Sequence, residues 1–456
     1  MSGALLMRLA VLGLVVLAGC ATQGTKMATP VPTSSAGELD PNDKFEGLVD
    51  SRQITIPSRT TRGPEAANFA NGLAMAPQAA APIVEFHVFA LGQSDSMLVI
   101  GPAPQRRTLL VDAGEVAWNS RANCQQIRMR VLALTGRTHV DYALITHYHV
   151  DHIGAPETTN ANTGRVNHSG GLFCLLDTGP EFFSIGTLID HGPARFAPSN
   201  HAVLDAIVAG VPEWNALGTL GSREVARFGT AQIDLGLGIS VDVLAFGGSV
   251  TANDPGALAA VEAAHPGTYQ PGAEASPNDF SIALEFTVGD FELFSAGDLS
   301  GAPGEPPYAA YIENGHNQIY TNVESYMVRR WREQGRESDV EVYRANHHGS
   351  ENSSTVDLLD ELRPELVLYS AGGRYGHPKR QTVDRVAAMG ADQIVTSAAA
   401  TDTWPDGFPA KYGNGWENPV GDIAILVPVG GDYYSVSTAE QAFNYPDYSD
   451  TQEAQR

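Results

Sequence analysis

The sequence predicts an α/β protein, because strand-like and helix-like segments alternate along most of the chain. Short runs of apolar, β-branched and aromatic residues, such as 83–90 and 366–370, are typical of buried strands. Other segments, such as 124–134, repeat their apolar residues with the helical period. Clusters of histidine and aspartate directly follow several strand-like runs, as in α/β enzymes that build their sites at one edge of a sheet.

The N-terminus has the pattern of a targeting segment at 1–20. Arg8 precedes the apolar run 9–18, which is too short to span a bilayer. The run ends in the letters LAGC, which resemble the lipobox of bacterial lipoproteins and imply cleavage before Cys20 and lipidation of that residue. An ordinary cleaved secretion signal is the alternative, and a retained anchor is a weaker one. We expect a lipid-anchored protein of the bacterial cell envelope, attached to a membrane through this lipid.

The rest of the chain divides by composition. Residues 21–82 are rich in Ala, Pro, Thr, Ser and Gly without a sustained apolar period, so we interpret them as a low-complexity tether. We expect the folded domain at 83–445 and a frayed acidic tail at 446–456. Within the domain, 155–275 has weak element signals. We interpret it as a long insertion around the site, part loop and part helix.

Charge and cysteine content limit the partners and the compartment. The formal net charge is −24, from 28 Lys and Arg against 52 Asp and Glu. Such an acidic surface opposes nucleic-acid binding along a basic face, but it does not oppose a small phosphate ester held by metal ions. Cys124 and Cys174 could pair in an oxidising compartment, although two separate buried thiols fit the sequence equally well.

The elements of the domain follow from apolar patterning between turn residues. Three strand-like runs open it, and a helix and a fourth strand follow. A hairpin and a final alternation of helices and strands complete it. In order, we expect strands at 83–90, 96–100, 108–111, 142–145, 281–288, 291–295, 340–344, 366–370, 393–396, 423–428 and 433–436, and helices at 124–134, 326–334, 355–362 and 381–389.

Residues 146–154 have the sequence THYHVDHIG and come directly after a buried strand. Three histidines and an aspartate within six residues suit a core poorly, but they are good ligands for Zn²⁺ and its first-row neighbours. Alternation at the strand end can direct His147 and His149 together, while the turn directs Asp151 and His152 the other way. This geometry suits two adjacent ions. A polar loop with fortuitous histidines is the weaker interpretation.

Further metal-binding side chains lie near the ends of other predicted strands. Asp298 follows one strand, and a carboxylate there could bridge two ions about 4 Å apart. His347 and His348 follow a second strand, His377 follows a third, and Asn278 precedes a fourth. Each has a structural alternative, such as a turn or an extended His-Pro segment. Together with the first cluster they predict a metal site.

As a set, these motifs resemble the metallo-β-lactamase superfamily. His-x-His-x-Asp-His is its signature, and the wider motifs are similar to the branch with the nuclease-like domain of the DNA-uptake protein ComEC and to related surface phosphodiesterases. The resemblance spans about 83–436 and implies an αββα sandwich of the metallo-β-lactamase type, with a long insertion after the signature. The motifs are FHVFALGQSDSMLVI, LLVDAGE, THYHVDHIG, NDFSIALEF, FSAGD, NHHGS and YGHP.

The resemblance also implies a role for each site residue. Its members bind two divalent ions, and a water shared between the ions is the nucleophile because they lower its pKa. Carried over, the first ion is held by His147 and His149 and the second by Asp151, His152 and His377; Asp298 bridges them, Asp112 orients ligands through hydrogen bonds, and Asp151, His347 and His348 act on the water and the substrate.

One position departs from the superfamily pattern. Asn278 stands where most members have a third histidine for the first ion, and Asn is a weak zinc ligand. The first ion could bind loosely, use His168, Asp177 or His191 from the insertion, or be a harder ion such as Mn²⁺. We therefore expect two divalent ions, with zinc favoured and manganese as the alternative.

These features predict a surface-tethered, metal-dependent hydrolase that cleaves phosphodiester bonds. The expected partner is a phosphoester-type small molecule or head group; the ComEC-like motifs suggest nucleic acid, which the charge of −24 opposes. Trp404 and Trp416 could contribute to a cage for a quaternary ammonium group, and Arg374 and Lys379 could neutralise phosphate, although packing and solvated roles are commoner. Alternatives are hydrolysis of a lactam, lactone or thioester, and a non-catalytic surface-binding lipoprotein with a relic site.

Overall fold

In the computed structural model, all residues whose structure is described lie in one compact unit, 77–456. The predicted signal and Cys20, almost all of the tether, the tail beyond 446, Trp404, Trp416 and Arg374 lie outside the described residues. No helix in the described ranges combines the length and the apolar character needed to cross a membrane. The described ranges are 81–116, 121–159, 166–193, 201–269, 274–302, 310–312, 318–336, 338–372, 376–396, 421–438 and 442–446.

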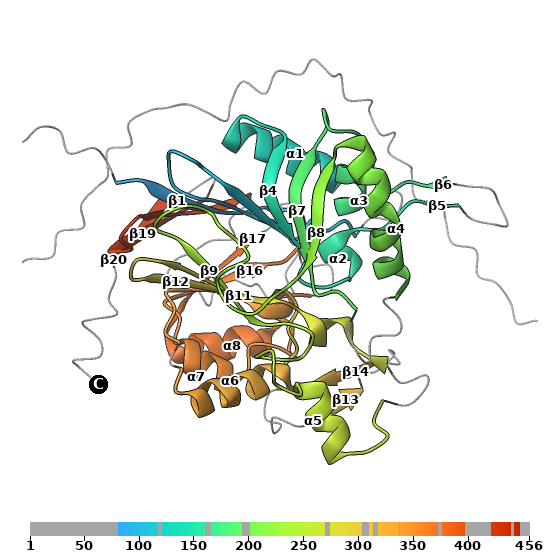
Figure 1. The fold of residues 1–456 in the computed structure, drawn as a ribbon. Helices are drawn as coiled ribbons and strands as arrows, with labels where there is room; N and C mark the ends of the chain where they lie inside the picture. Colours follow the sequence, from blue (N-terminus) through green and yellow to red (C-terminus); the bar gives the residue numbers. More distant parts are fainter. Residues whose placement is uncertain are drawn as a thin grey trace, which may run out of the picture. The chain divides into compact units, whose positions relative to one another are not determined.

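The larger of the two main sheets has nine strands (Figure 1). Their order is β20 (Ala442–Pro446), β19 (Tyr433–Ser437), β18 (Ile423–Pro428), β1 (Ile83–Val88), β2 (Met97–Ile100), β3 (Thr108–Val111), β4 (His139–Leu144), β7 (Ser184–Asp190) and β8 (Leu220–Val225). The pairs β1–β2 and β2–β3 are antiparallel, whereas β3, β4, β7 and β8 run parallel. The parallel half therefore places the loops after β3, β4 and β7 at one edge.

The second main sheet has six strands. Their order is β17 (Asp392–Thr396), β16 (Leu366–Ser370), β15 (Val342–Arg344), β12 (Phe291–Ser295), β11 (Ala283–Val288) and β9 (Ser240–Ala245). Strands β17, β16, β15 and β12 run parallel, and β11 is antiparallel to both β12 and β9. Two small sheets complete the strands, one of β10 (Glu274–Ala275), β14 (Gln318–Thr321) and β13 (Ala310–Ile312), the other of β5 (Thr158–Thr159) and β6 (Val166–Asn167).

The two main sheets pack face to face, and helices cover their outer faces (Figure 1). Alternation along the strands produces this arrangement: Leu366 and Leu368 of β16 belong to the core between the sheets, while Val367 and Tyr369 belong to the core under the helices. The helices are α1 (Ala122–Thr135), α3 (Gly171–Asp177) and α4 (His201–Leu217) on the nine-stranded sheet, and α5 (Ala257–Ala264), α6 (Val323–Gln334), α7 (Val356–Leu362) and α8 (Arg380–Met389) on the six-stranded sheet. These four layers confirm the αββα sandwich.

The predicted elements outside 155–275 agree with the structure, and four strands, β3, β12, β16 and β18, have the predicted bounds. Region 155–275 does more than surround the site: it supplies β7 and β8 to the larger sheet and β9 to the smaller one. Local sequence signals are weak there for physical reasons. Strand β8 is a polar edge strand with five of its six residues only partly buried or exposed. Helix α4 contains Pro212, and α3 begins directly after Gly170.

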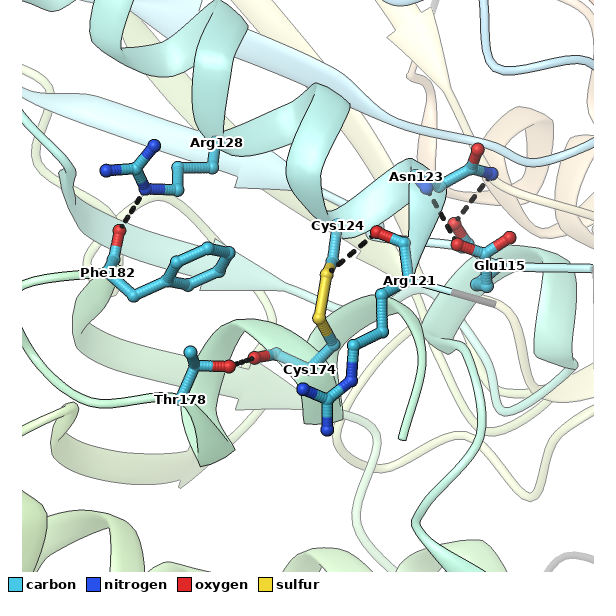
Figure 2. Close-up of a disulfide and its surroundings, with 9 residues drawn as sticks. Glu115, Arg121, Asn123, Cys124, Arg128, Cys174, Thr178 and Phe182 are labelled. Carbon is cyan, nitrogen blue, oxygen red and sulfur yellow. Dashed lines mark hydrogen bonds between the residues drawn. A yellow bond between two sulfur atoms is a disulfide. The ribbon is translucent and has the colours of Figure 1, made fainter. Parts of the chain in front are cut away.

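Cys124 of α1 and Cys174 of α3 form a disulfide, which the sequence left open (Figure 2). Their Cα atoms lie 6.1 Å apart, within the range for such a bridge. Around it, Arg128 Nε donates a hydrogen bond of 2.8 Å to the Phe182 carbonyl, and the Asn123 backbone N–H donates to Glu115. The bridge therefore joins two helices of one outer layer, and α1 is also attached to the loop that follows β3.

Candidate metal centre

The predicted site residues converge where the ends of the two sheets meet. The loops after β3 and β4 come from the larger sheet, and those after β12, β15 and β16 come from the smaller one. Two backbone hydrogen bonds hold these loops together: Ile282 donates to Thr146 at 3.0 Å, and His347 donates to Gly297 at 3.0 Å. The side chains in these loops therefore occupy one shared volume.

The first ligand group consists of His147, His149 and Asp298, whose ligand atoms all lie within 4.8 Å of one another. His147 Nε2 lies 3.1 Å from His149 Nδ1 and 3.8 Å from Asp298 Oδ2. Ligands of a tetrahedral zinc ion lie about 3.3 Å apart, so this spacing suits one ion. Burial, and then the nearby charge of His152, hold the pKa of His147 well below its usual value, which keeps a lone pair available for a metal.

The second ligand group consists of Asp95, His152 and His348. His152 Nε2 lies 3.3 Å from His348 Nε2 and 2.9 Å from Asp298 Oδ1. Asp151 Oδ2 lies 3.5 Å from His348 Nε2. Asp298 therefore directs one carboxylate oxygen toward each group, as a bridge between two cations requires.

The ring orientations of His152 and His348 are set by their other nitrogens. His152 Nδ1 donates to Asp112 Oδ2 at 2.8 Å. His348 Nδ1 donates to the Ser370 carbonyl at 2.6 Å, because a carbonyl oxygen can only accept. Both Nε2 atoms are thus left to face Asp298. Asp112 also accepts hydrogen bonds from the backbone N–H and hydroxyl of Thr146, each at 2.8 Å, and it is fully buried.

Asp151 and Asp298 are anionic despite their burial. Burial alone would raise the pKa of Asp151, but a hydrogen bond from His348 and the charge of His152 lower it to about 2. In the same way, the charges of His152 and His348 outweigh burial and hold the pKa of Asp298 well below its usual value. Two buried anions among histidines favour the binding of divalent cations.

Asn278 lies beside the first group, in the short 3₁₀ helix η1 (Pro277–Phe280). Its Nδ2 is 3.3 Å from His347 Nε2, and His347 Nε2 is 3.7 Å from Asp298 Oδ2. Its Oδ1 is buried and has no hydrogen-bond partner among the described residues. An orphaned amide oxygen next to this anionic cluster suits a cation better than it suits an apolar core.

The three insertion residues considered as substitutes for a third histidine do not join either group in the described structure. His168 is exposed and lies 3.6 Å from Glu157. Asp177 accepts a hydrogen bond of 2.7 Å from the Trp214 indole. His191 packs its ring against Tyr148, with centroids 4.1 Å apart. Among the described residues, Asn278 is therefore the better candidate to complete the first ion's shell.

His347 and His377 lie next to the ligand groups rather than in them. His347 has a positive φ of 51° and a side chain that is 16% exposed. His377 stacks on His348 with centroids 6.0 Å apart, and its Nδ1 lies 3.4 Å from Gln93 Nε2. Burial, and then the charges of His347 and His348, lower the pKa of His377 to about 2. The structure thus brings His348 into the second group and places His377 beside it, while their roles stay predictions.

Asp95 is a site residue that the sequence interpretation did not single out. It lies in the turn between β1 and β2, where its backbone N–H donates to the Asp151 carbonyl at 2.7 Å. Its carboxylate forms an ion pair with the buried Arg344, at the end of β15, and lies 3.7 Å from His152 Nδ1. The available signal was an acidic residue in a short turn between two buried strands.

Comparisons with known proteins found similar solved structures only. No protein-family model and no curated protein matches this sequence. Among solved structures, it is similar to CmlA, a diiron β-hydroxylase from Streptomyces venezuelae (TM-score 0.34, 13% identity, 70% of this chain and 53% of that one). It is also similar to Zn²⁺-bound PqqB from Methylobacterium extorquens (0.34, 13%, 67% and 85%) and to unliganded yeast PDE1 (0.29, 12%, 71% and 91%).

This chain thus spans about half the length of CmlA. What the site can do therefore follows from its own residues: two adjacent ligand groups share Asp298, and the partly exposed His149, Asp151 and His347 form its accessible side. The described residues thus bring together two groups of potential metal ligands that fit a divalent metal site.

Proposed function

We propose that this chain is a metal-dependent hydrolase of the metallo-β-lactamase superfamily that cleaves phosphodiester bonds. The observation that carries the proposal is Asp298, whose two oxygens face the two ligand groups at 2.9 Å from His152 Nε2 and 3.8 Å from His147 Nε2. Two divalent ions bound there would supply a water of lowered pKa and would polarise the ester oxygen.

The protein's own residues would orient the reactants. Asp151 and Asp298 are anionic acceptors and can align a water through hydrogen bonds. His347 lies at the accessible side, 3.7 Å from Asp298 Oδ2, where it can donate an N–H to a phosphate oxygen or a proton to the leaving alkoxide. Donation to the leaving group is typically worth about 10²–10⁴-fold in rate. This donor favours a substrate that carries anionic oxygens.

For the metals, we propose zinc in the second group and a weaker, exchangeable site in the first. His152 and His348 both present Nε2, which suits zinc. The first group has two histidines and the Asn278 oxygen, a harder and weaker ligand that also suits Mn²⁺. The proposed substrate is a small phosphodiester or head group, because a chain with a net charge of −24 repels long polyanions.

The test combines metal analysis with a substrate panel. Metal-loaded protein should hydrolyse bis-p-nitrophenyl phosphate and leave nitrocefin intact. His149→Ala and Asp151→Ala should each lose bound metal and turnover, whereas His265→Ala, a matched change on the exposed end of α5, should retain both. Phosphodiester turnover that survives the first two substitutions would overturn the proposal. Preferential hydrolysis of nitrocefin would indicate that the substrate is a lactam and not a phosphodiester.

We also propose that the chain is anchored to a membrane of the bacterial envelope by lipid on Cys20. The letters LAGC at 17–20 support this. Cys20→Ala should move the protein from the membrane fraction to the soluble fraction of expressing bacteria. Equal membrane association of the two forms would contradict the anchor.

A further inference from the structure

A cavity of about 550 Å³ lies where the edge strands of the two main sheets meet. The chain leaves β8 of the larger sheet and pairs with β9 of the smaller one through mutual backbone hydrogen bonds between Gly229 and Val243, at 3.2 and 3.3 Å. The segments after β7, β8 and β9 line the cavity. Its volume lies within the range of small-molecule sites, about 300–1,000 Å³.

His191 connects this cavity to the metal centre. Its ring packs on Tyr148, with centroids 4.1 Å apart, and Tyr148 stands between His147 and His149 in sequence. On another side it stacks with Phe280 at 5.8 Å, in the same short helix as Asn278. His191 therefore contacts the segment that carries His147 and His149 and the segment that carries Asn278, and it also lines the cavity.

His191 is a buried polar side chain, 4% exposed, and neither of its ring nitrogens has a hydrogen-bond partner among the described residues. The adjacent Asp190 is already engaged, because it accepts from Arg223 at 2.7 and 2.8 Å and from the Tyr148 hydroxyl at 3.1 Å. Burial lowers the pKa of His191 to about 4, so at neutral pH its ring offers one donor and one acceptor.

The rest of the cavity wall offers aromatic surface rather than free charge. Phe228 and Phe246 pack together with centroids 4.4 Å apart, and both are half-buried. The Asp254 carboxylate accepts from the Tyr326 hydroxyl at 2.5 Å. Arg227 is exposed and pairs with a glutamate of β8 at 2.9 Å. Such a wall favours a flat, uncharged ring over an ion.

We propose that this cavity binds the organic group of the phosphodiester substrate, and that this group is a flat, uncharged ring carrying a hydrogen-bonding atom that His191 recognises. The inference rests on the proposed function and names its substrate class. His191 determines specificity: its nitrogens contact the ring, while the ester phosphate occupies the metal centre, which His191 adjoins through Tyr148 and Phe280.

Three diesters with the same p-nitrophenolate leaving group test the idea: the methyl, phenyl and pyridin-3-yl esters of p-nitrophenyl phosphate. With metal-loaded protein, kcat/KM should rise from methyl to phenyl to pyridin-3-yl, the last step by roughly three- to tenfold for one hydrogen bond. His191→Phe keeps a ring between Tyr148 and Phe280 but removes both nitrogens, so the pyridin-3-yl to phenyl ratio should fall to near one.

Two other variants separate this effect from a general loss of structure. Phe228→Ala should reduce the phenyl to methyl ratio, and the matched His265→Phe on the surface should leave both ratios unchanged. Equal kcat/KM for all three diesters in the unmodified protein would overturn the inference while the proposed function stands. So would a pyridin-3-yl preference that survives His191→Phe.

A binding measurement distinguishes failure of this inference from failure of the proposed function. In protein labelled with ¹⁵N at histidine, the imidazole resonances of His191 are assigned as those absent from the spectrum of His191→Phe. Addition of 3-hydroxypyridine to the unmodified protein should shift these resonances, and phenol should shift them less. This result would support the ring site even if no phosphodiester were hydrolysed. If 3-hydroxypyridine leaves the His191 resonances unmoved, the ring site is wrong.

Discussion

At the residue scale, the centre depends on which nitrogen of each histidine is free. Asp112 accepts a hydrogen bond from His152 Nδ1 at 2.8 Å, and the Ser370 carbonyl accepts one from His348 Nδ1 at 2.6 Å. Both remaining Nε2 atoms face Asp298, where a metal ion would displace their protons. Partners of this kind fix the tautomer and raise ligand basicity.

Asp112→Asn should therefore lower the affinity for the second ion by about 10–100-fold, because the amide keeps the size of the carboxylate but loses its charge. Chelator-competition titration with zinc measures this. The matched control is Asp141→Asn: Asp141 accepts from the backbone and hydroxyl of Thr108, as Asp112 does from Thr146, but it belongs to neither ligand group. Equal zinc affinity in Asp112→Asn and the unmodified protein would show that Asp112 has no role in metal binding.

At the element scale, the loop after β15 is held in a strained conformation. His347 and His348 have φ values of 51° and 53°, a region that costs non-glycine residues about 1 kcal/mol or more each. Glu324 of α6 holds this loop through hydrogen bonds at its start and just beyond its end. It is fully buried and accepts from Asn346 Nδ2, Ser354 N–H and Thr355 N–H at 2.8, 2.8 and 2.7 Å.

Glu324→Gln should destabilise the protein by about 1–3 kcal/mol, because an amide in this position confronts backbone donors with its own N–H₂ group. It should also lower metal occupancy, since His348 is delivered by the supported loop. Urea unfolding and metal analysis measure the two effects. Glu361→Gln, which removes an ion pair with the exposed Arg332, should change neither by a comparable amount. Unchanged stability in Glu324→Gln would contradict the supporting role.

The disulfide is a second stabilising feature at the element scale, because it joins α1 to α3 across 50 residues of sequence. For a loop of that length the chain-entropy model gives about 4 kcal/mol, and measured bridges typically contribute about 2–4 kcal/mol. The double change Cys124→Ala with Cys174→Ala should lower the free energy of unfolding by about that amount. Dithiothreitol should produce a similar loss in the unmodified protein and none in the double variant. Identical urea midpoints would refute this estimate.

At the scale of the whole molecule, the two sheets bring ligands from opposite layers to one edge. His147 and His149 follow a strand of the larger sheet, and Asp298 follows one of the smaller. The ligand groups therefore require correct packing of the complete sandwich. The net charge of −24 acts at the same scale, because a strongly acidic chain disfavours the approach of large anions.

Salt should consequently affect large and small substrates differently. Raising NaCl from about 20 to about 200 mM screens the repulsion, so kcat/KM for a short oligonucleotide should rise, while that for bis-p-nitrophenyl phosphate should change little. Steady-state rates at fixed metal concentration measure the comparison. A fall in the oligonucleotide rate with salt would instead indicate a cationic binding track for nucleic acid.

From residue patterns alone, the sequence predicted the alternation of helices and strands and most of the cluster, and the αββα sandwich followed only from the family resemblance. Strong apolar periods located β3 and β16, and His147, His149 and Asp298 follow strands because the carboxyl ends of parallel strands carry such sites. It also identified Asp112, although its hydrogen bond to His152 became visible only in three dimensions. Roles that require long-range geometry could be assigned from the sequence only through the resemblance.

Contacts between residues that are far apart in sequence could be identified only in the folded chain. Asp95 joined the second ligand group because the turn after β1 lies against Asp151, and no local pattern reports that contact. His348 and His377 stack on one another, so only atomic positions show which of them lies within reach of Asp298. The polar edge strand β8 was equally hidden, because pairing with β7 rather than apolar periodicity stabilises it.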